Sequence, residues 1–123
     1  MPLVRIILYA NILLEGSMAL LFWFFPTWIA RQSALPLVTG GEVPRMLMAM
    51  YGSAALIPVI IGAWALREEE GSSTRSGLII LLIVFHTLLS LSQFLYNPDP
   101  RGGTLHLLLA AGLSAGWKKE MKR

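Results

Sequence analysis

The sequence contains no cysteine and few charged residues. Only 14% of its 123 residues are Asp, Glu, Lys or Arg, whereas soluble proteins average about 25%. The missing cysteine excludes disulfides, thiolate metal sites and redox-active thiols. The sequence also lacks a glycine-rich phosphate loop, a serine-nucleophile motif and a dinucleotide-binding fingerprint. The sequence therefore gives no support for an enzyme, although it does not exclude one.

Hydrophobic residues, by contrast, make up 55% of the chain and are gathered in four long runs. Uninterrupted runs of this kind are typical of helices that cross a membrane. The expected helices are 3–25, 46–66, 78–96 and 104–117. The first three are long enough for a hydrocarbon core of about 30 Å, whereas the fourth spans only about 21 Å. The sequence predicts an all-α, four-transmembrane-helix bundle that forms a single membrane domain over residues 1–123.

The connections between these segments differ in character. The stretch 27–44 contains Pro36, Pro44 and Gly40-Gly41, and we expect a loop that lies on the membrane surface. Residues 67–77 are polar and predict a solvated, flexible turn, and residues 97–103 predict a tight turn.

The basic residues predict the orientation. With four crossings, both termini share a side with the 67–77 connection, and that side carries seven of the ten Lys and Arg residues. The positive-inside rule therefore places both termini in the cytoplasm. Aromatic residues near the segment ends, Trp23, Trp28, Trp64, Tyr96 and Trp117, are expected at the two interfaces.

Polar side chains within the apolar segments are the candidates for a functional site, because lipid offers them no hydrogen-bond partners. Asn11 and Glu15 lie four residues apart and share one face of the first segment. His86 begins a polar line on the third segment, and His106 lies near the start of the fourth. The candidate ligand-binding or proton-relay residues are Asn11, Glu15, Tyr51, His86, Ser90, Gln93 and His106.

Depth along the segments predicts which of these side chains meet. Glu15 and His86 each lie about 15 Å from the outer end of their segments, so we expect them to pair near the midplane. His106 lies only two residues into the fourth predicted segment, so its expected neighbours are Gln93 and Asn97. The predicted site then opens outward along the polar line of the third segment.

The same residues have a structural interpretation. Hydrogen bonds between buried polar side chains hold membrane helices together, at about 0.6 to 2 kcal/mol each, and the sequence leaves this alternative open. In the second segment, small residues follow Tyr51, and Pro58 removes the helical hydrogen bond to the Ala54 carbonyl. These features indicate either close packing or a cavity lined by Tyr51 and the freed carbonyl.

Neither haem nor a metal ion is predicted. The two histidines differ in expected depth by about 10 Å, too far for two axial ligands of one haem across the bundle. The same offset separates His106 from Glu15, and no His-x-x-x-His or Glu-x-x-His spacing occurs. No cofactor is therefore expected. Because the basic residues lie at segment ends, the net charge of +3 indicates lipid headgroups rather than nucleic acid as the partner.

A few short features match a known pattern of small bacterial membrane proteins. They are Glu15-Gly16 in the first segment, Pro26 directly after it, Arg45 before the second segment and Tyr51-Gly52 within it. Together with the four-segment plan of the whole chain, they resemble the DoxX-like family. The resemblance implies a four-helix membrane protein of bacteria and a role of the kind filled by accessory subunits of membrane oxidoreductases.

We therefore expect a small polytopic protein of the bacterial inner membrane that assembles with itself or with a larger membrane complex. Its expected role is that of an accessory or binding subunit for a hydrophobic or lipid-like ligand. One alternative is a proton-coupled transporter of the small multidrug type, in which Glu15 exchanges a proton for a cationic substrate. The other alternative is a membrane-embedded enzyme.

Overall fold

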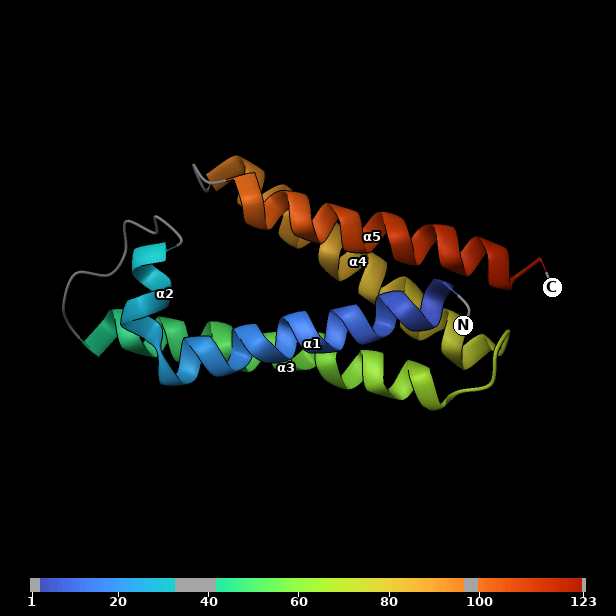
Figure 1. Cartoon of the computed structure of the whole chain (residues 1–123), viewed down its shortest axis with the longest axis horizontal. Coiled ribbons are helices and arrows are strands. Elements are labelled where there is room, and N and C mark those ends of the chain that lie inside the picture. The colour runs from blue at the N-terminus through green and yellow to red at the C-terminus, as the bar shows by residue number, and fades with distance from the viewer. Residues whose placement is uncertain (1–2, 33–41, 97–99, 123) are drawn as a thin grey trace.

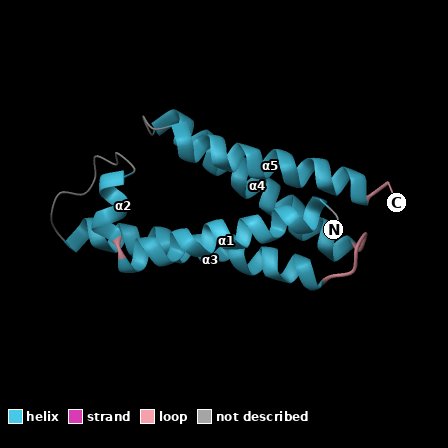
Figure 2. Ribbon diagram, viewed as in Figure 1, coloured by secondary structure: helices cyan, strands magenta, loops and turns pink. Residues whose placement is uncertain are grey.

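The computed structural model describes residues 3–32, 42–96 and 100–122, and all regular elements among them are α-helices (Figure 2). These helices are α1 (Leu3–Phe24), α2 (Pro26–Gln32), α3 (Glu42–Arg67), α4 (Ser73–Tyr96) and α5 (Pro100–Glu120). Three stretches are long and apolar enough to cross a membrane: Leu3–Phe24, Arg45–Arg67 and Ser73–Tyr96. The predicted all-α class is confirmed, and the apolar helices indicate membrane association.

The four long helices form two antiparallel pairs (Figure 1). Helix α1 lies along α3, and α4 lies along α5. The pairs meet less extensively through contacts of α3 with α4 and of α1 with α5. In Figure 1 the pairs converge near the two termini and diverge toward α2. The start of α1 and the end of α5 therefore lie at the same end of the molecule.

The larger of two apolar clusters among the described residues lies at the converging end, where all four long helices contribute. Its buried residues are Val4, Leu8, Ala65, Leu78, Ile79, Leu82 and Leu113. Glycines let α5 approach α1 closely here: a Cβ on Gly116 would lie 2.6 Å from Val4 Cγ2, and one on Gly112 would lie 3.0 Å from Ile7 Cδ1. Small residues of α5 therefore permit close packing against α1.

The fourth helix is longer in the structure than the predicted range 104–117. Helix α5 begins at Pro100 and ends at Glu120, and its 21 residues extend about 31 Å. Proline at the first helical position needs no hydrogen-bond partner for its nitrogen and is preset to helical φ, so Pro100 starts the helix rather than breaking it. The two glycines that follow, read from sequence as part of a turn, lie inside the first turns of α5.

Two predicted connections are also partly helical. Residues 26–32 form α2 rather than loop, whereas residues 33–41 of that predicted loop and 97–99 of the predicted tight turn lie outside the described residues. The 67–77 turn is shorter than predicted, because α4 begins at Ser73. The Ser72 hydroxyl accepts a hydrogen bond from the Arg75 backbone N–H at 3.2 Å. Ser72 is therefore the N-cap of α4, and Gly71, at φ +81°, makes the turn before it.

Candidate functional site

Four polar side chains from three helices converge in the interior of the bundle. They are Asn11 and Glu15 of α1, His86 of α4 and His106 of α5, and each is buried. The regular spacing of α1 explains its contribution, because Val4, Leu8, Asn11, Glu15 and Ala19 are its buried residues and follow steps of three and four. We call Asn11, Glu15, His86 and His106 the polar centre.

Asn11 connects the two helix pairs. Its Nδ2 donates to the Pro58 carbonyl oxygen of α3 at 2.9 Å, and its Oδ1 lies 2.8 Å from His86 Nε2 of α4. A carbonyl can only accept, so the amide nitrogen must face Pro58 and the amide oxygen must face the histidine. Gly62 provides the space, since a Cβ there would lie 2.8 Å from Asn11 Nδ2.

This orientation of Asn11 determines the tautomer of His86. Because Asn11 Oδ1 is an acceptor, His86 Nε2 must carry a proton and donate it. In a neutral imidazole the other nitrogen, Nδ1, then has a free lone pair. That lone pair faces His106 Nδ1 at 3.0 Å, and the two rings stack with centroids 5.2 Å apart. Either a proton on His106 Nδ1 or a bound cation is needed between these nitrogens.

Glu15 lies beside both ring nitrogens. Its Oε1 is 3.4 Å from His106 Nδ1 and 3.8 Å from His86 Nδ1. Only 4% of the Glu15 side chain is exposed. Within the described part of the chain its buried Oε1 has no hydrogen-bond partner. A buried carboxylate oxygen without a hydrogen bond is energetically costly, so a purely structural role leaves this atom unexplained.

The predicted offset of about 10 Å between His106 and His86 was wrong, because their Nδ1 atoms lie 3.0 Å apart. The Ser90 hydroxyl donates to the Gly103 carbonyl at 2.8 Å, which sets the antiparallel register of α4 and α5. About one turn further into the bundle along each helix, His86 and His106 are in contact. Starting the fourth helix at Thr104 instead of Pro100 accounts for about 6 Å of the predicted offset of about 10 Å. Because the two Nδ1 atoms lie 3.0 Å apart, the argument against a metal ion that depended on this offset no longer holds.

The other sequence candidates lie outside the polar centre. Ser90 is buried but hydrogen-bonds to Gly103, and Gln93 packs against Gly102, where a Cβ would overlap its Oε1. Tyr51 is exposed and stacks on Phe22 with centroids 6.0 Å apart. Asn97, the other expected neighbour of His106, lies outside the described residues.

The sequence left open whether the second segment packs closely or lines a cavity, and it did not predict how α3 contributes to the polar centre. The carbonyl that receives a side-chain hydrogen bond is that of Pro58 itself, not the freed carbonyl of Ala54. The closest sequence signal was Gly62, one turn after Pro58. A glycine on a helix face often marks a close approach of another group.

A second buried polar group was not predicted. Arg75, counted from sequence as a charge in a solvated turn, is buried in α4, with its side chain 1% exposed. Its Nε lies 2.8 Å from Glu120 Oε1, and its Nη1 donates to the Glu68 carbonyl at 3.1 Å. The ion pair ties the start of α4 to the end of α5. No pattern in the sequence links positions 75 and 120.

The polar centre combines groups suited to two kinds of chemistry. Two imidazoles and a carboxylate can pass a proton among themselves, and the same three groups can bind a metal ion. The candidate ligand atoms of Glu15, His86 and His106 lie within 4.8 Å of one another.

Comparison with known proteins adds no further assignment. No protein-family model matches this chain, and neither a curated protein nor a solved structure matches it.

Proposed function

We propose that this chain is an integral membrane protein that crosses the bilayer four times and serves as a small binding subunit. Its ligand site is the polar centre of Glu15, His86 and His106, with Asn11 positioning His86. The observation that carries the proposal is the buried Oε1 of Glu15, which faces two imidazole nitrogens and makes no hydrogen bond in the described structure.

The fourth crossing in this proposal is α5. Three of its leucines, Leu105, Leu107 and Leu108, are 40 to 64% exposed, and such side chains are suited to lipid. The helix packs along α4 and is about as long as the hydrocarbon core is thick. Lys118 and Lys119 in its last turn can extend to the headgroups.

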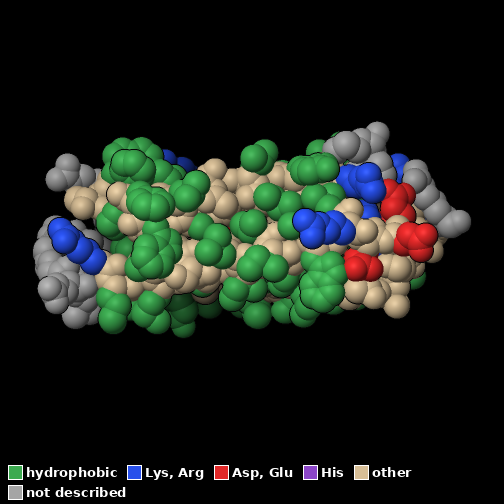
Figure 3. Space-filling view, turned by 90° about the horizontal axis from the view of Figure 1, so that it is seen from below, with side chains coloured by type: hydrophobic (Ala, Val, Ile, Leu, Met, Phe, Trp, Pro, Cys, Tyr) green, Lys and Arg blue, Asp and Glu red, His purple; other side chains and the backbone are tan. Residues whose placement is uncertain are grey.

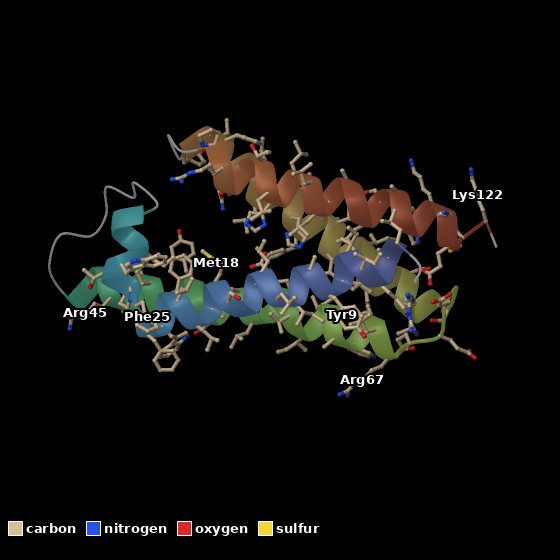
Figure 4. The ribbon with its side chains drawn as sticks, viewed as in Figure 1. Tyr9, Met18, Phe25, Arg45, Arg67 and Lys122 are labelled. Atoms are coloured by element: carbon tan, nitrogen blue, oxygen red, sulfur yellow. The ribbon has the colours of Figure 1, made fainter. Side chains whose placement is uncertain are left out.

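The distribution of charge supports a transmembrane arrangement. Hydrophobic side chains cover much of the middle of the face seen in Figure 3, and charged ones gather toward its two ends. Arg45 lies at the α2 end, while Arg67 and Lys122 lie at the opposite end (Figure 4). We propose a bacterial inner membrane, with the end that holds both termini in the cytoplasm, by the positive-inside rule and the DoxX-like resemblance.

This orientation is tested by labelling introduced cysteines, for which the chain has no background because it contains none. Glu69→Cys in intact spheroplasts should resist a membrane-impermeant maleimide, whereas Arg45→Cys should react. The opposite pattern would reverse the proposed orientation, and equal labelling of both would contradict a transmembrane arrangement.

The site proposal is tested by measuring the stability of the protein with neither metal nor other ligand bound. A ligand site and a structural ion pair respond differently to Glu15→Gln. In a ligand site, replacing an uncompensated buried carboxylate with a neutral amide leaves stability unchanged or raises it by up to about 2 kcal/mol. If Glu15 were half of a structural ion pair, the substitution would cost about 3 kcal/mol or more.

The matched control is Asn11→Ala, which removes two hydrogen bonds between helices. It should destabilise the protein by about 1 to 3 kcal/mol in the same detergent unfolding assay. A loss of stability in Glu15→Gln as large as that in Asn11→Ala would contradict the binding proposal.

A second candidate function is a proton-coupled transporter that uses Glu15. It is favoured by the position of the polar centre where the two helix pairs meet, because transporters place their sites between units that move relative to each other. Reconstituted vesicles carrying a pH gradient would test it. Uptake of a cationic dye that is lost in Glu15→Gln would support transport, and gradient-independent uptake would exclude it.

A further inference from the structure

We infer that Glu15, His86 and His106 together bind one divalent transition-metal ion of the Zn²⁺ class. This inference rests on the proposed function, since it names the chemistry of the ligand at the same site. Each residue contributes one atom: Oε1 of Glu15 and Nδ1 of each histidine. All three residues are buried, and their candidate ligand atoms form a compact group.

The spacing of these three atoms matches a metal site. The sides of the triangle that they form are 3.0, 3.4 and 3.8 Å. Zinc binds histidine nitrogen and carboxylate oxygen at about 2.0 to 2.2 Å, and tetrahedral geometry then separates its ligands by about 3.4 Å. The point equidistant from the three atoms lies about 2.0 Å from each of them, by the geometry of a triangle with these sides. An ion at that point would have ordinary zinc–ligand distances to all three atoms.

The hydrogen bond from His86 to Asn11 is also characteristic of a metal ligand. A histidine that binds a metal through one nitrogen usually donates its other N–H to an oxygen, which fixes the tautomer and the ring orientation. His86 Nε2 donates to Asn11 Oδ1 at 2.8 Å, so that Nδ1 presents its lone pair to the site. Asn11 is held in turn by Pro58 of α3, so three of the long helices, α1, α3 and α4, contribute to the position of this ligand.

The proposed ion removes one cost and accounts for one close contact. It gives the buried Glu15 Oε1 a partner, and it lies where two imidazole nitrogens 3.0 Å apart need a cation or proton between them. The ligand set of two nitrogens and one oxygen favours zinc and its first-row neighbours over magnesium or calcium, which prefer oxygen alone. Three protein ligands leave a fourth position for water or another small ligand.

The inference is tested with Co²⁺, a coloured substitute for Zn²⁺. The full-length protein is purified in detergent without a histidine tag, stripped with a chelator and titrated with Co²⁺. We expect visible absorption bands of four-coordinate cobalt that saturate at one ion per chain and disappear on addition of Zn²⁺. Failure of the wild-type protein to develop these bands, together with no Zn²⁺ binding by calorimetry, would overturn the inference.

Substitutions then identify the ligands. Glu15→Gln and His106→Gln should each weaken metal affinity by about 100-fold or more, and Asn11→Ala should weaken it by about 10- to 100-fold as a supporting residue. The matched control is Thr87→Val. Thr87 lies next to His86 on α4, and its exposed hydroxyl donates to the Ile83 carbonyl. The metal affinity of Thr87→Val should stay within about twofold of that of the wild-type protein. Equal affinity in Glu15→Gln and wild type would place the metal elsewhere and contradict the inference.

The effect of Zn²⁺ on stability can be measured on the wild-type protein, so this test does not depend on whether a variant folds. A ligand that binds only the folded state stabilises it, by about 2.7 kcal/mol at a concentration 100 times Kd. Zn²⁺ should therefore raise the unfolding midpoint of the wild-type protein, and chelator should reverse the shift. A midpoint that does not respond to Zn²⁺ would count against the inference.

The inference and the proposed function can fail separately. If Glu15→Gln is neutral or stabilising in metal-free protein while Co²⁺ gives no bands, the site binds something other than a metal, and only the inference falls. If Glu15→Gln is strongly destabilising in metal-free protein, the carboxylate is structural, and the proposed function falls whatever the metal titration gives.

Discussion

Replacing Gly62 with alanine should disturb the polar centre without touching any of its side chains. A Cβ at position 62 would lie 2.8 Å from Asn11 Nδ2 and 3.3 Å from Ile12 Cγ1. Real Cβ atoms do not approach a nitrogen that closely, so Asn11 must move. Because its amide is hydrogen-bonded to both Pro58 and His86, movement in any direction weakens at least one of these bonds.

The size of the effect follows from opposing contributions. Overpacking a buried contact costs about 1 to 3 kcal/mol, and each weakened hydrogen bond between helices costs about 0.6 to 1.5 kcal/mol. Alanine gains up to about 1 kcal/mol over glycine in a helix interior. We therefore expect Gly62→Ala to lower the free energy of unfolding by about 2 kcal/mol.

The assay is equilibrium unfolding in mixed micelles, followed by circular dichroism. The matched control is Gly77→Ala, because Gly77 is exposed within α4 and a Cβ there meets nothing within 4 Å. Helix propensity alone acts at that position, so the control should be as stable as wild type or up to about 1 kcal/mol more stable.

A double-mutant cycle tests the cause. In an Asn11→Ala background the clash with the amide is absent, and the cost of Gly62→Ala should fall by about 1 kcal/mol or more, leaving the contact with Ile12. The reasoning is refuted if Gly62→Ala is as stable as Gly77→Ala, or if its cost is the same with and without the Asn11 amide.

Two further predictions concern the converging end of the bundle. Gly116→Ala would place a Cβ 2.6 Å from Val4 Cγ2 and 3.1 Å from the Val4 backbone nitrogen, so it should destabilise the protein by about 1 to 3 kcal/mol in the same assay; wild-type stability would show that α5 does not pack this closely on α1. Arg75→Leu should cost about 3 kcal/mol because it leaves buried Glu120 unpaired, and adding Glu120→Leu should recover most of that loss. A double variant as unstable as the single one would show that the ion pair is not what the loss reflects.

Much of the fold was predictable because hydrophobicity is a local property of the sequence. The apolar runs predicted the long helices, and the spacing of Asn11 and Glu15 predicted a shared buried face, which the structure has. The ends of helices were less predictable. Gly102, Gly103 and Ser72 are residue types common in turns, yet the two glycines lie inside α5 and Ser72 caps α4. Neighbouring helices stabilise segments of low intrinsic helix propensity.

The pairing of Glu15 with His86 was predicted, but His106 was expected beside Gln93 and Asn97 and not in the polar centre. Residue spacing gives the depth of a side chain only if the helix ends are known, and the start of α5 at Pro100 instead of Thr104 shifts His106 by about one turn. The shift accounts for about 6 Å of the predicted offset of about 10 Å, and the structure places His106 Nδ1 3.0 Å from His86 Nδ1. The buried pair of Arg75 and Glu120 depended on the same register.

The sequence by itself determined that the chain is helical, that its long helices are apolar, and that a few polar groups are buried among them, because these properties follow from each residue and its near neighbours. Only the tertiary structure decided which polar groups meet. Contacts such as that between His86 and Asn11, 75 residues apart in the chain, depend on how helices pack side by side, and packing is set by the close contacts of Gly62, Gly112 and Gly116 rather than by any local pattern.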